Sequence, residues 1–204
     1  MNDRAGRLSV QRPVLDLGAG EFGTSSYHNL VPGFSGLRAF SVDIAVEKHP
    51  SILADISVSL PLRESEFQTC FAFNLLEHLY EFDNLLREIF RVLTPGGRLY
   101  IAIPFLLRVH PDPHDYARYT GQYLERRLAE AGFSSVFVEP CGWGAVTAAL
   151  SQLDFLVVRI FRGSVLRMSI LLDKLITKRS GGAYRNSSDY PIGYFASATK
   201  PITQ

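Results

Sequence analysis

The chain has 204 residues, of which 47% are hydrophobic and 20% are charged. These values fit a globular domain with a substantial core and exclude an intrinsically disordered chain. The formal net charge is only +1, which argues against nucleic acid as a partner, because nucleic-acid binding usually needs a concentrated basic surface.

Cysteine usage and the character of the first residues indicate the compartment. Cys70 and Cys141 lie far apart and show no metal-ligand spacing, as is typical of proteins in a reducing environment. Residues 1–13 are polar and lack the apolar core of a signal peptide, and the sequence contains no run of about 20 apolar residues. We therefore expect a cytoplasmic protein without a spanning helix.

Strand-like and helix-like segments alternate along most of the chain. Short apolar runs predict strands at "PVLDL", "LRAFSVDI", "CFAFNLL", "RLYIAIP", "SVFVEP" and "YPIGYFASATK". Repeated strand–helix–strand units predict an α/β fold with one Rossmann-like, doubly wound sheet, mostly parallel, with helices on both faces. Residues 1–204 are expected to form a single domain.

Two helices are predicted with defined ends. In "EFDNLLREIFRVLTPGG" apolar residues recur at helical spacing, Asp83 is the expected N-cap, and the glycines after Pro95 are the expected terminator. In "TGQYLERRLAEAGF" the helix is expected to run from Thr120 as N-cap to Gly132 as terminator.

The segment from Val146 to Arg179 is strongly apolar but carries several basic residues. We expect a helical insertion over residues 146–190, before the last strand, although Gly163 makes one continuous helix doubtful. Three uses stay open: helices packed on the sheet or acting as a lid, a homodimer contact, or a peripheral contact of residues 146–179 with an anionic membrane surface.

Gly18, Gly20 and Gly23 follow the first strand with the spacing of a dinucleotide fingerprint. Asp43 ends the second strand, where a carboxylate can accept hydrogen bonds from ribose hydroxyls. Asp16 favours one cofactor over the other, because its carboxylate would repel a pyrophosphate but attract the cationic amino-acid end of S-adenosylmethionine. The glycines are therefore predicted to hold S-adenosylmethionine.

Five motifs occur in a fixed order over residues 13–104: "VLDLGAG", "SVDI", "ADISVSLPL", "NLLEHL" and "LLREIFRVLTPGGRLYIAIP". Together they resemble the class I S-adenosylmethionine-dependent methyltransferases. The segment "HPDPHDYARYTGQYLERRLAEAGF" is similar to one found in a branch that acts on small molecules and sugar-pathway intermediates. The resemblance implies an antiparallel last strand, next to the strand that ends at Pro140.

The resemblance also implies a set of cofactor-binding residues, which follow the first, second and fourth strands and the short connection between them. They are Asp16, Gly18, Gly20, Asp43, Ile44, Asp55, Ile56, Asn74 and Leu75. Only eleven residues separate Asp43 from Asp55, which is too few for the full helix that the family usually has there.

The acceptor is expected to enter near the segment "RVHPDPHDYARYT", which follows the fifth strand. The predicted catalytic residues, which would take a proton from a hydroxyl acceptor, are His110, His114 and Asp115. The predicted substrate contacts are His78, Arg118, Tyr119 and Trp143. A polar loop without catalytic function stays open, as does the role of Glu77, either at the cofactor or in an ion pair.

No metal site is predicted, because His110, Asp112, His114 and Asp115 would all have to fold around one ion. We expect S-adenosylmethionine-dependent methyl transfer by in-line displacement to a small-molecule acceptor such as a sugar or a lipid-linked intermediate. The alternative is a methyltransferase-like binding protein without catalytic activity.

Overall fold

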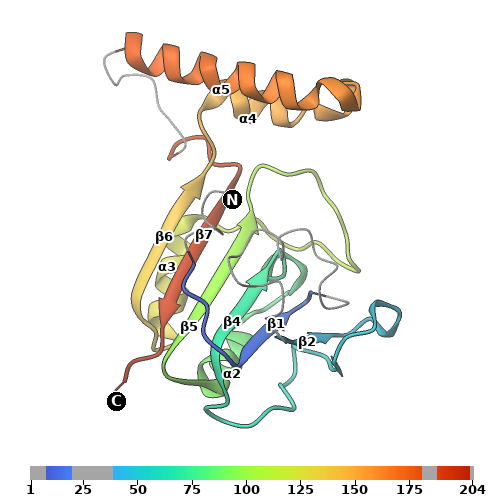
Figure 1. Cartoon of the computed structure of the whole chain (residues 1–204), viewed down its shortest axis with the longest axis vertical. Coiled ribbons are helices and arrows are strands. Elements are labelled where there is room, and N and C mark those ends of the chain that lie inside the picture. Colours follow the sequence, from blue (N-terminus) through green and yellow to red (C-terminus); the bar gives the residue numbers. More distant parts are fainter. Residues whose placement is uncertain (1–7, 20–38, 181–187, 203–204) are drawn as a thin grey trace.

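A computed structural model describes residues 8–19, 39–180 and 188–202. These residues form a seven-stranded sheet with the strand order β3-β2-β1-β4-β5-β7-β6 (Figure 1). The strands are β1 Val14–Leu17, β2 Ala39–Asp43, β3 Ile52–Leu53, β4 Phe67–Phe73, β5 Leu93–Pro104, β6 Ser134–Cys141 and β7 Gly193–Thr199. β7 is antiparallel to both of its neighbours, and the other pairs are parallel. The predicted fold class and the antiparallel last strand beside β6 are confirmed.

The apolar strands are buried on both faces of the sheet. Helices α2, Asp83–Val92, and α3, Gly121–Glu130, cover one face with fully buried leucine and isoleucine side chains (Figure 1). On the other face, Leu8 and Val10 pack against a second cluster that contains Phe71 and Tyr100. The fully buried strands explain why β1 and β4 read as nearly continuous apolar runs.

The predicted ends of α2 were wrong at both termini. Asp83 is the first residue of the helix rather than its N-cap, which is Phe82, because the Asp83 carboxylate accepts a hydrogen bond from Nε of Arg127 on α3 at 2.8 Å. The helix ends at Val92, before Pro95 is reached. Its last carbonyl groups instead accept hydrogen bonds from the chain that enters β4, and β5 begins at once.

The ends of α3 are as predicted. The Thr120 side chain accepts a hydrogen bond from the backbone N–H of Tyr123 at 3.3 Å, as an N-cap does. Gly132 follows the helix with φ of +95°, a conformation that favours glycine. Between β2 and β3 a single 3₁₀ turn, Val46–Lys48, takes the place of a full helix, as the short spacing between Asp43 and Asp55 predicted.

The insertion before β7 contains α4, Ala145–Ser151, two 3₁₀ turns, Asp154–Leu156 and Arg159–Phe161, and α5, Arg162–Arg179. Its break lies before Gly163, which takes part in the first turn of α5. Figure 1 shows α4 and α5 beyond the end of the sheet, not on either face. Among the residues described, no helix has the length and apolar character needed to cross a membrane.

Two polar residues of α5 join it to α4. The carboxylate of Asp173, which is buried, accepts hydrogen bonds from the backbone N–H groups of Val146 at 3.0 Å and Thr147 at 2.9 Å. The hydroxyl groups of Thr147 and Ser169 lie 3.2 Å apart. Asp173 therefore caps the N-terminus of α4 from a different helix, which makes α4 and α5 one unit.

Candidate functional site

A cavity of about 520 Å³ lies at the carboxyl ends of β1, β2 and β4. This is the edge at which ligands bind in open α/β sheets. Seven of the nine predicted cofactor-binding residues line the cavity: Gly18, Asp43, Ile44, Asp55, Ile56, Asn74 and Leu75. The fold thus gathers residues that are far apart in the sequence into one wall.

Gly18 forms the turn at the end of β1. Its backbone N–H donates to the carbonyl oxygen of Val42 at 2.8 Å, and its φ is +69°. A Cβ atom at this position would lie 2.6 Å from Cδ1 of Leu75. Only glycine therefore fits both the backbone conformation and the space.

Two of the predicted cofactor-binding residues that line the cavity are acidic. Asp43 is buried at the end of β2, and its Oδ1 atom accepts a hydrogen bond from the backbone N–H of Ala45 at 2.9 Å. Asp55 is exposed, and its Oδ1 atom accepts from the backbone N–H and the hydroxyl group of Ser57 at 2.9 and 2.6 Å. These bonds fix the orientation of both carboxylates at the cavity.

The two other predicted cofactor residues are placed differently. Asp16 is fully buried within β1 and is not one of the described residues that line the cavity. Gly20 lies outside the described residues.

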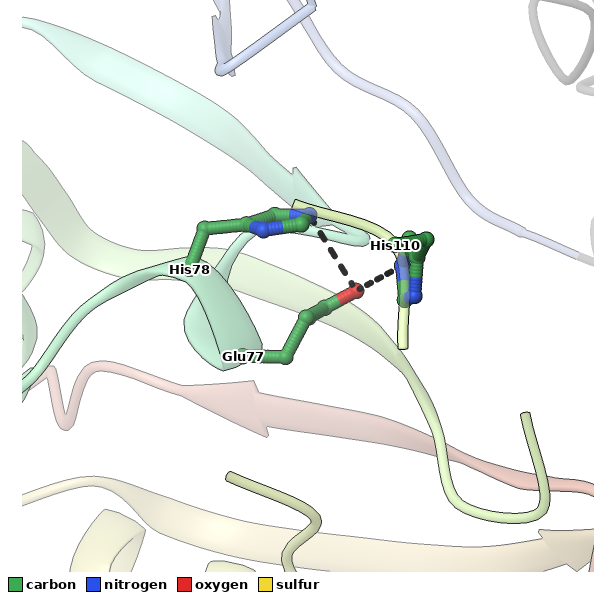
Figure 2. Close-up of side chains that lie close together, drawn as sticks. All are labelled: Glu77, His78 and His110. Carbon is green, nitrogen blue, oxygen red and sulfur yellow. Dashed lines mark ion pairs between the residues drawn. The ribbon is translucent and has the colours of Figure 1, made fainter. Parts of the chain in front are cut away.

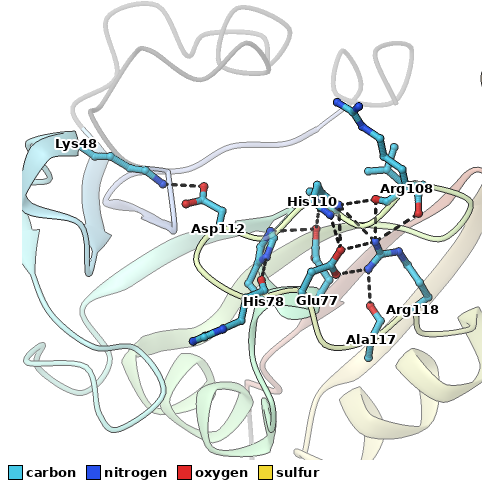
Figure 3. Close-up of polar contacts among 11 residues, drawn as sticks. Lys48, Glu77, His78, Arg108, His110, Asp112, Ala117 and Arg118 are labelled. Carbon is cyan, nitrogen blue, oxygen red and sulfur yellow. Dashed lines mark hydrogen bonds and ion pairs between the residues drawn. The ribbon is translucent and has the colours of Figure 1, made fainter. Parts of the chain in front are cut away.

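The loop after β5 is held by an ion pair. The Asp115 carboxylate, whose side chain is 2% exposed, accepts hydrogen bonds from Arg118 and from the backbone N–H of His110 at 2.9 Å (Figure 3). The hydrogen bond from Arg118 holds the pKa of Asp115 well below its usual range. Arg118 also donates to the carbonyl oxygen of Ala117 at 3.0 Å. The Asp115 carboxylate and the Arg118 guanidinium thus hold each other in place.

Glu77, His78 and His110 lie together beside this ion pair. Oε1 of Glu77 is 3.8 Å from Nε2 of His78 and 3.8 Å from Nε2 of His110 (Figure 2). Glu77 is 1% exposed, and burial raises the pKa of its carboxyl group. The sequence left the role of Glu77 open, and the "NLLEHL" motif gave no sign that His110 would join it.

The remaining predicted residues lie at this cavity, against Phe82, or at a second cavity. His78 and His114 line the cavity, and Asp112, which also lines it, pairs with Lys48 at 3.0 Å (Figure 3). Tyr119 is half-buried, packs edge-on against Phe82, and has a pKa raised by burial. Asp112 and Asp115 thus lie in separate ion pairs.

Trp143 lines a second cavity, of about 720 Å³, against the sheet face formed by β5, β7 and β6. Phe137 and Tyr194 contribute further aromatic surface to it. Asn74, at the end of β4, lines both cavities and has φ of +50°. Asn74 is thus part of the wall of both cavities.

Comparisons with known proteins agree with this geometry. Residues 15–101 match the family model described as a methyltransferase domain. A comparison with curated protein sequences gave no match.

Among solved structures, the chain is similar to a SAM-dependent methyltransferase from Archaeoglobus fulgidus, with 18% identity, a TM-score of 0.61, and coverage of 92% of this chain and 85% of that chain. It is also similar to phosphoethanolamine N-methyltransferase 2 from Haemonchus contortus in complex with S-adenosyl-L-methionine, with 16% identity, a TM-score of 0.59, and coverage of 98% and 51%. The chain thus spans about half the length of the nematode enzyme. The likeness confirms the fold, and the family model shows that residues 15–101 are similar to a methyltransferase domain.

Proposed function

We propose that the chain binds S-adenosylmethionine in the 520 Å³ cavity and transfers its methyl group to a small-molecule acceptor. The observation that carries the proposal is the wall that Gly18, Asp43 and Asn74 form with four other predicted residues. Asp43 would accept hydrogen bonds from the ribose hydroxyls. Ile44, 59% exposed at the cavity, would lie against the adenine ring, and Asn74 would lie near the methyl group.

We propose that the second cavity holds the acceptor. In an in-line displacement the nucleophile approaches the methyl group from the side opposite the sulfur, so donor and acceptor need adjacent but separate spaces. The 720 Å³ cavity shares Asn74 with the wall of the first cavity, so the two are neighbours, which fits this requirement. Its aromatic surface, including Trp143, favours an acceptor with an apolar part.

A hydroxyl acceptor also needs a group that removes its proton, whereas a carboxylate acceptor does not. Of the predicted catalytic residues, Asp115 is held ionised by Arg118, so we propose that it positions His110 rather than touching substrate. Activation of the acceptor would then belong to the group formed by Glu77, His78 and His110, which begins in the turn just after Asn74. His114 would contact bound ligand from the cavity wall.

Turnover tests this proposal. The protein is incubated with S-adenosylmethionine and a panel of small alcohols, amines and carboxylic acids, and S-adenosylhomocysteine is measured. The expected result is product formation with one acceptor class, and its loss in Asp43→Asn but not in Glu125→Gln, an exposed position on α3. Binding of S-adenosylhomocysteine without turnover on any class would instead support the non-catalytic alternative.

We further propose that α5 contacts an anionic membrane surface. Met168, Leu171, Leu172 and Leu175 are each more than 40% exposed and recur at helical spacing, so they form an apolar stripe. Residues 155–180 carry six basic residues and one acid, Asp173, which is buried. Exposed apolar side chains together with basic residues occur on helices that lie in the interface of an anionic bilayer. The cytoplasmic leaflet has this charge, in agreement with the expected cytoplasmic location.

Co-sedimentation with vesicles tests the membrane contact. We expect binding to vesicles of phosphatidylcholine with phosphatidylglycerol, weaker binding at high salt, and little binding to phosphatidylcholine alone. Leu171→Glu should abolish binding, whereas Gln122→Glu, at an exposed position of α3, should not. The opposite result has two parts: the native chain does not bind vesicles, and it sediments as a stable dimer that Leu171→Glu dissociates. That result would show that the stripe is a homodimer contact.

A further inference from the structure

Three potential metal ligands converge at the carboxyl edge of the sheet, beside the cofactor cavity that His78 lines. Glu77 and His78 come from the 3₁₀ turn Leu76–His78 after β4, and His110 comes from the loop after β5. One ligand atom from each lies within 4.8 Å of the other two. Figure 2 shows the Glu77 carboxylate between the two imidazole rings.

The ring of His78 is oriented by a backbone carbonyl group. Its Nδ1 atom lies 2.5 Å from the carbonyl oxygen of His114. A carbonyl oxygen can only accept a hydrogen bond, so Nδ1 carries the proton and donates it. Nε2 is then the atom with a lone pair, and it is the atom that faces Glu77.

The ring of His110 is oriented in the same way. Its Nδ1 atom lies 3.0 Å from the carbonyl oxygen of Arg108 and 3.3 Å from the Asp115 carboxylate, which are both acceptors. One donor, Nη2 of Arg118, lies farther away at 3.4 Å. The proton therefore belongs on Nδ1, and Nε2 presents its lone pair to Glu77. Histidine ligands of metals are typically held in this manner by a carbonyl or carboxylate group behind the ring.

The Glu77 carboxylate has no hydrogen-bond partner in the part of the chain that the structure describes. Glu77 is 1% exposed, and among the described residues neither of its oxygen atoms has a hydrogen-bond partner. A buried carboxylate without a donor is costly, and two lone pairs directed toward it do not lower that cost. A divalent cation between the three groups would satisfy the carboxylate and both nitrogens at once.

We propose that Glu77, His78 and His110 form a binding site for a divalent transition-metal ion. Metal–nitrogen and metal–oxygen bonds of about 2.0 to 2.2 Å place neighbouring ligands of a tetrahedral site about 3.3 Å apart. Each 3.8 Å separation between Glu77 and a histidine therefore needs a closure of about 0.5 Å, and the two histidine ligand atoms, which lie within 4.8 Å of each other, need a closure of up to about 1.5 Å. Two imidazoles and one carboxylate suit zinc, manganese or ferrous iron better than magnesium or calcium. Because Arg118 is neutralised by Asp115, Glu77 leaves the site with one net negative charge.

Three protein ligands leave at least one coordination position open, as in catalytic metal sites. His78 also lines the cofactor cavity, so the site borders the space in which methyl transfer is proposed. If the proposed function holds, an acceptor hydroxyl group bound to the ion would lose its proton more easily. This role rests on the proposed function, whereas metal binding does not.

Calorimetry on the full chain, stripped of metal with a chelator and dialysed, tests the site. Zn²⁺ and Mn²⁺ are titrated alone, and Mg²⁺ and Ca²⁺ serve as the oxygen-preferring comparison. We expect one Zn²⁺ or Mn²⁺ site per chain, and Glu77→Gln and His110→Asn should each lower its affinity by about 100-fold or more. His49→Asn is the matched control, since His49 is exposed with φ of +47°, a conformation that asparagine tolerates.

Two results would overturn the proposal: no Zn²⁺ or Mn²⁺ binding by the native chain, or equal losses in His49→Asn and His110→Asn. Circular dichroism shows whether each variant is folded. Should His110→Asn unfold, Co²⁺ absorption of the native chain and of Glu77→Gln replaces it, since four-coordinate Co²⁺ absorbs visible light much more strongly than Co²⁺ surrounded by water. S-adenosylhomocysteine binding, measured separately, distinguishes failure of the metal site from failure of the proposed function.

Discussion

Cδ1 of Leu75 lies 2.6 Å from the place that a Cβ atom on Gly18 would take, so the turn after β1 and the turn after β4 fit only while residue 18 has no side chain. Gly18→Ala is expected to strain the backbone by about 1–2 kcal/mol, because φ is +69°, and to push Leu75 into the cavity. The affinity for S-adenosylhomocysteine should fall at least about tenfold, equivalent to 1.4 kcal/mol.

The double variant Gly18→Ala with Leu75→Ala separates the two effects. It removes the collision but keeps the backbone strain, so calorimetry should show partial recovery of affinity relative to Gly18→Ala. Native-like affinity in Gly18→Ala would mean that the ligand does not depend on this turn.

A charged pair on α2 anchors the chain beside the cofactor cavity. Glu88 accepts hydrogen bonds from Arg91 at 2.8 Å and from the backbone N–H of Leu60 at 2.9 Å, and Arg91 donates to the carbonyl oxygens of Leu60 and Leu62. The hydrogen bond from Arg91 lowers the pKa of Glu88. A carboxyl group whose pKa is lower in the folded state adds stability above its unfolded pKa, about 4.3, and loses it as the pH falls.

We therefore expect Glu88→Gln to lower the free energy of unfolding by about 1 kcal/mol at pH 7, since the pair is partly solvated. The difference from the native chain should shrink as the pH falls below about 4. Urea unfolding at pH 7, 5 and 3 measures this, with Glu125→Gln as the control. A difference that stays the same at all three pH values would show that the carboxylate charge is not what stabilises the segment.

Metal binding at Glu77 should be visible as a gain in thermal stability. A Zn²⁺ concentration of about 100 times the dissociation constant adds about 2.7 kcal/mol, which raises the Tm of a chain of this size by about 5 to 10 °C. Glu77→Gln should lose this gain. Without metal, Glu77→Gln should be at least as stable as the native chain, because it removes a buried carboxylate that has no hydrogen-bond donor among the described residues.

Thermal unfolding followed by circular dichroism, with and without Zn²⁺, gives both values. An equal rise in Tm for the native chain and Glu77→Gln would place the ion elsewhere. A strongly destabilised metal-free Glu77→Gln would show that the carboxylate is already paired with the two histidines.

We expect the contact between Asp173 and α4 to stabilise these two helices but not the cofactor cavity. Asp173→Ala leaves the N–H groups of Val146 and Thr147 without their acceptor, at a cost of about 2 kcal/mol. Because α4 and α5 stand beyond the sheet, limited proteolysis should cut residues 152–161 faster while the affinity for S-adenosylhomocysteine stays unchanged. Lys174→Ala, an exposed neighbour, should leave the cleavage rate as it is. Loss of S-adenosylhomocysteine binding in Asp173→Ala would instead show that the helices support the cavity.

The sequence predicted the sheet well because its signals are local. Val14–Leu17 and Phe67–Phe73 are apolar runs that bury both faces, and the glycine after β1 and the acid after β2 mark strand ends that must meet at one edge. The position of the cavity could therefore be predicted from the expected order of the strands.

Long-range contacts explain the errors and omissions. Asp83 meets the local preference for an N-cap, but Arg127 on another helix takes its carboxylate. Likewise, the grouping of Glu77 with His110 depends on the path of the loop after β5, which the Asp115–Arg118 pair fixes. The periodic patterns that predict helices and strands do not predict the path of a loop.

The most direct test of the account is calorimetric titration of S-adenosylhomocysteine into the native chain and into Asp43→Asn. Asparagine still accepts the hydrogen bond from Ala45, so the turn is preserved while the negative charge that we propose binds the ribose hydroxyls is removed. We predict micromolar binding by the native chain and a loss of about 100-fold, or roughly 3 kcal/mol, in the variant. Equal affinities, or no binding by the native chain, would contradict the assignment of this cavity to S-adenosylmethionine.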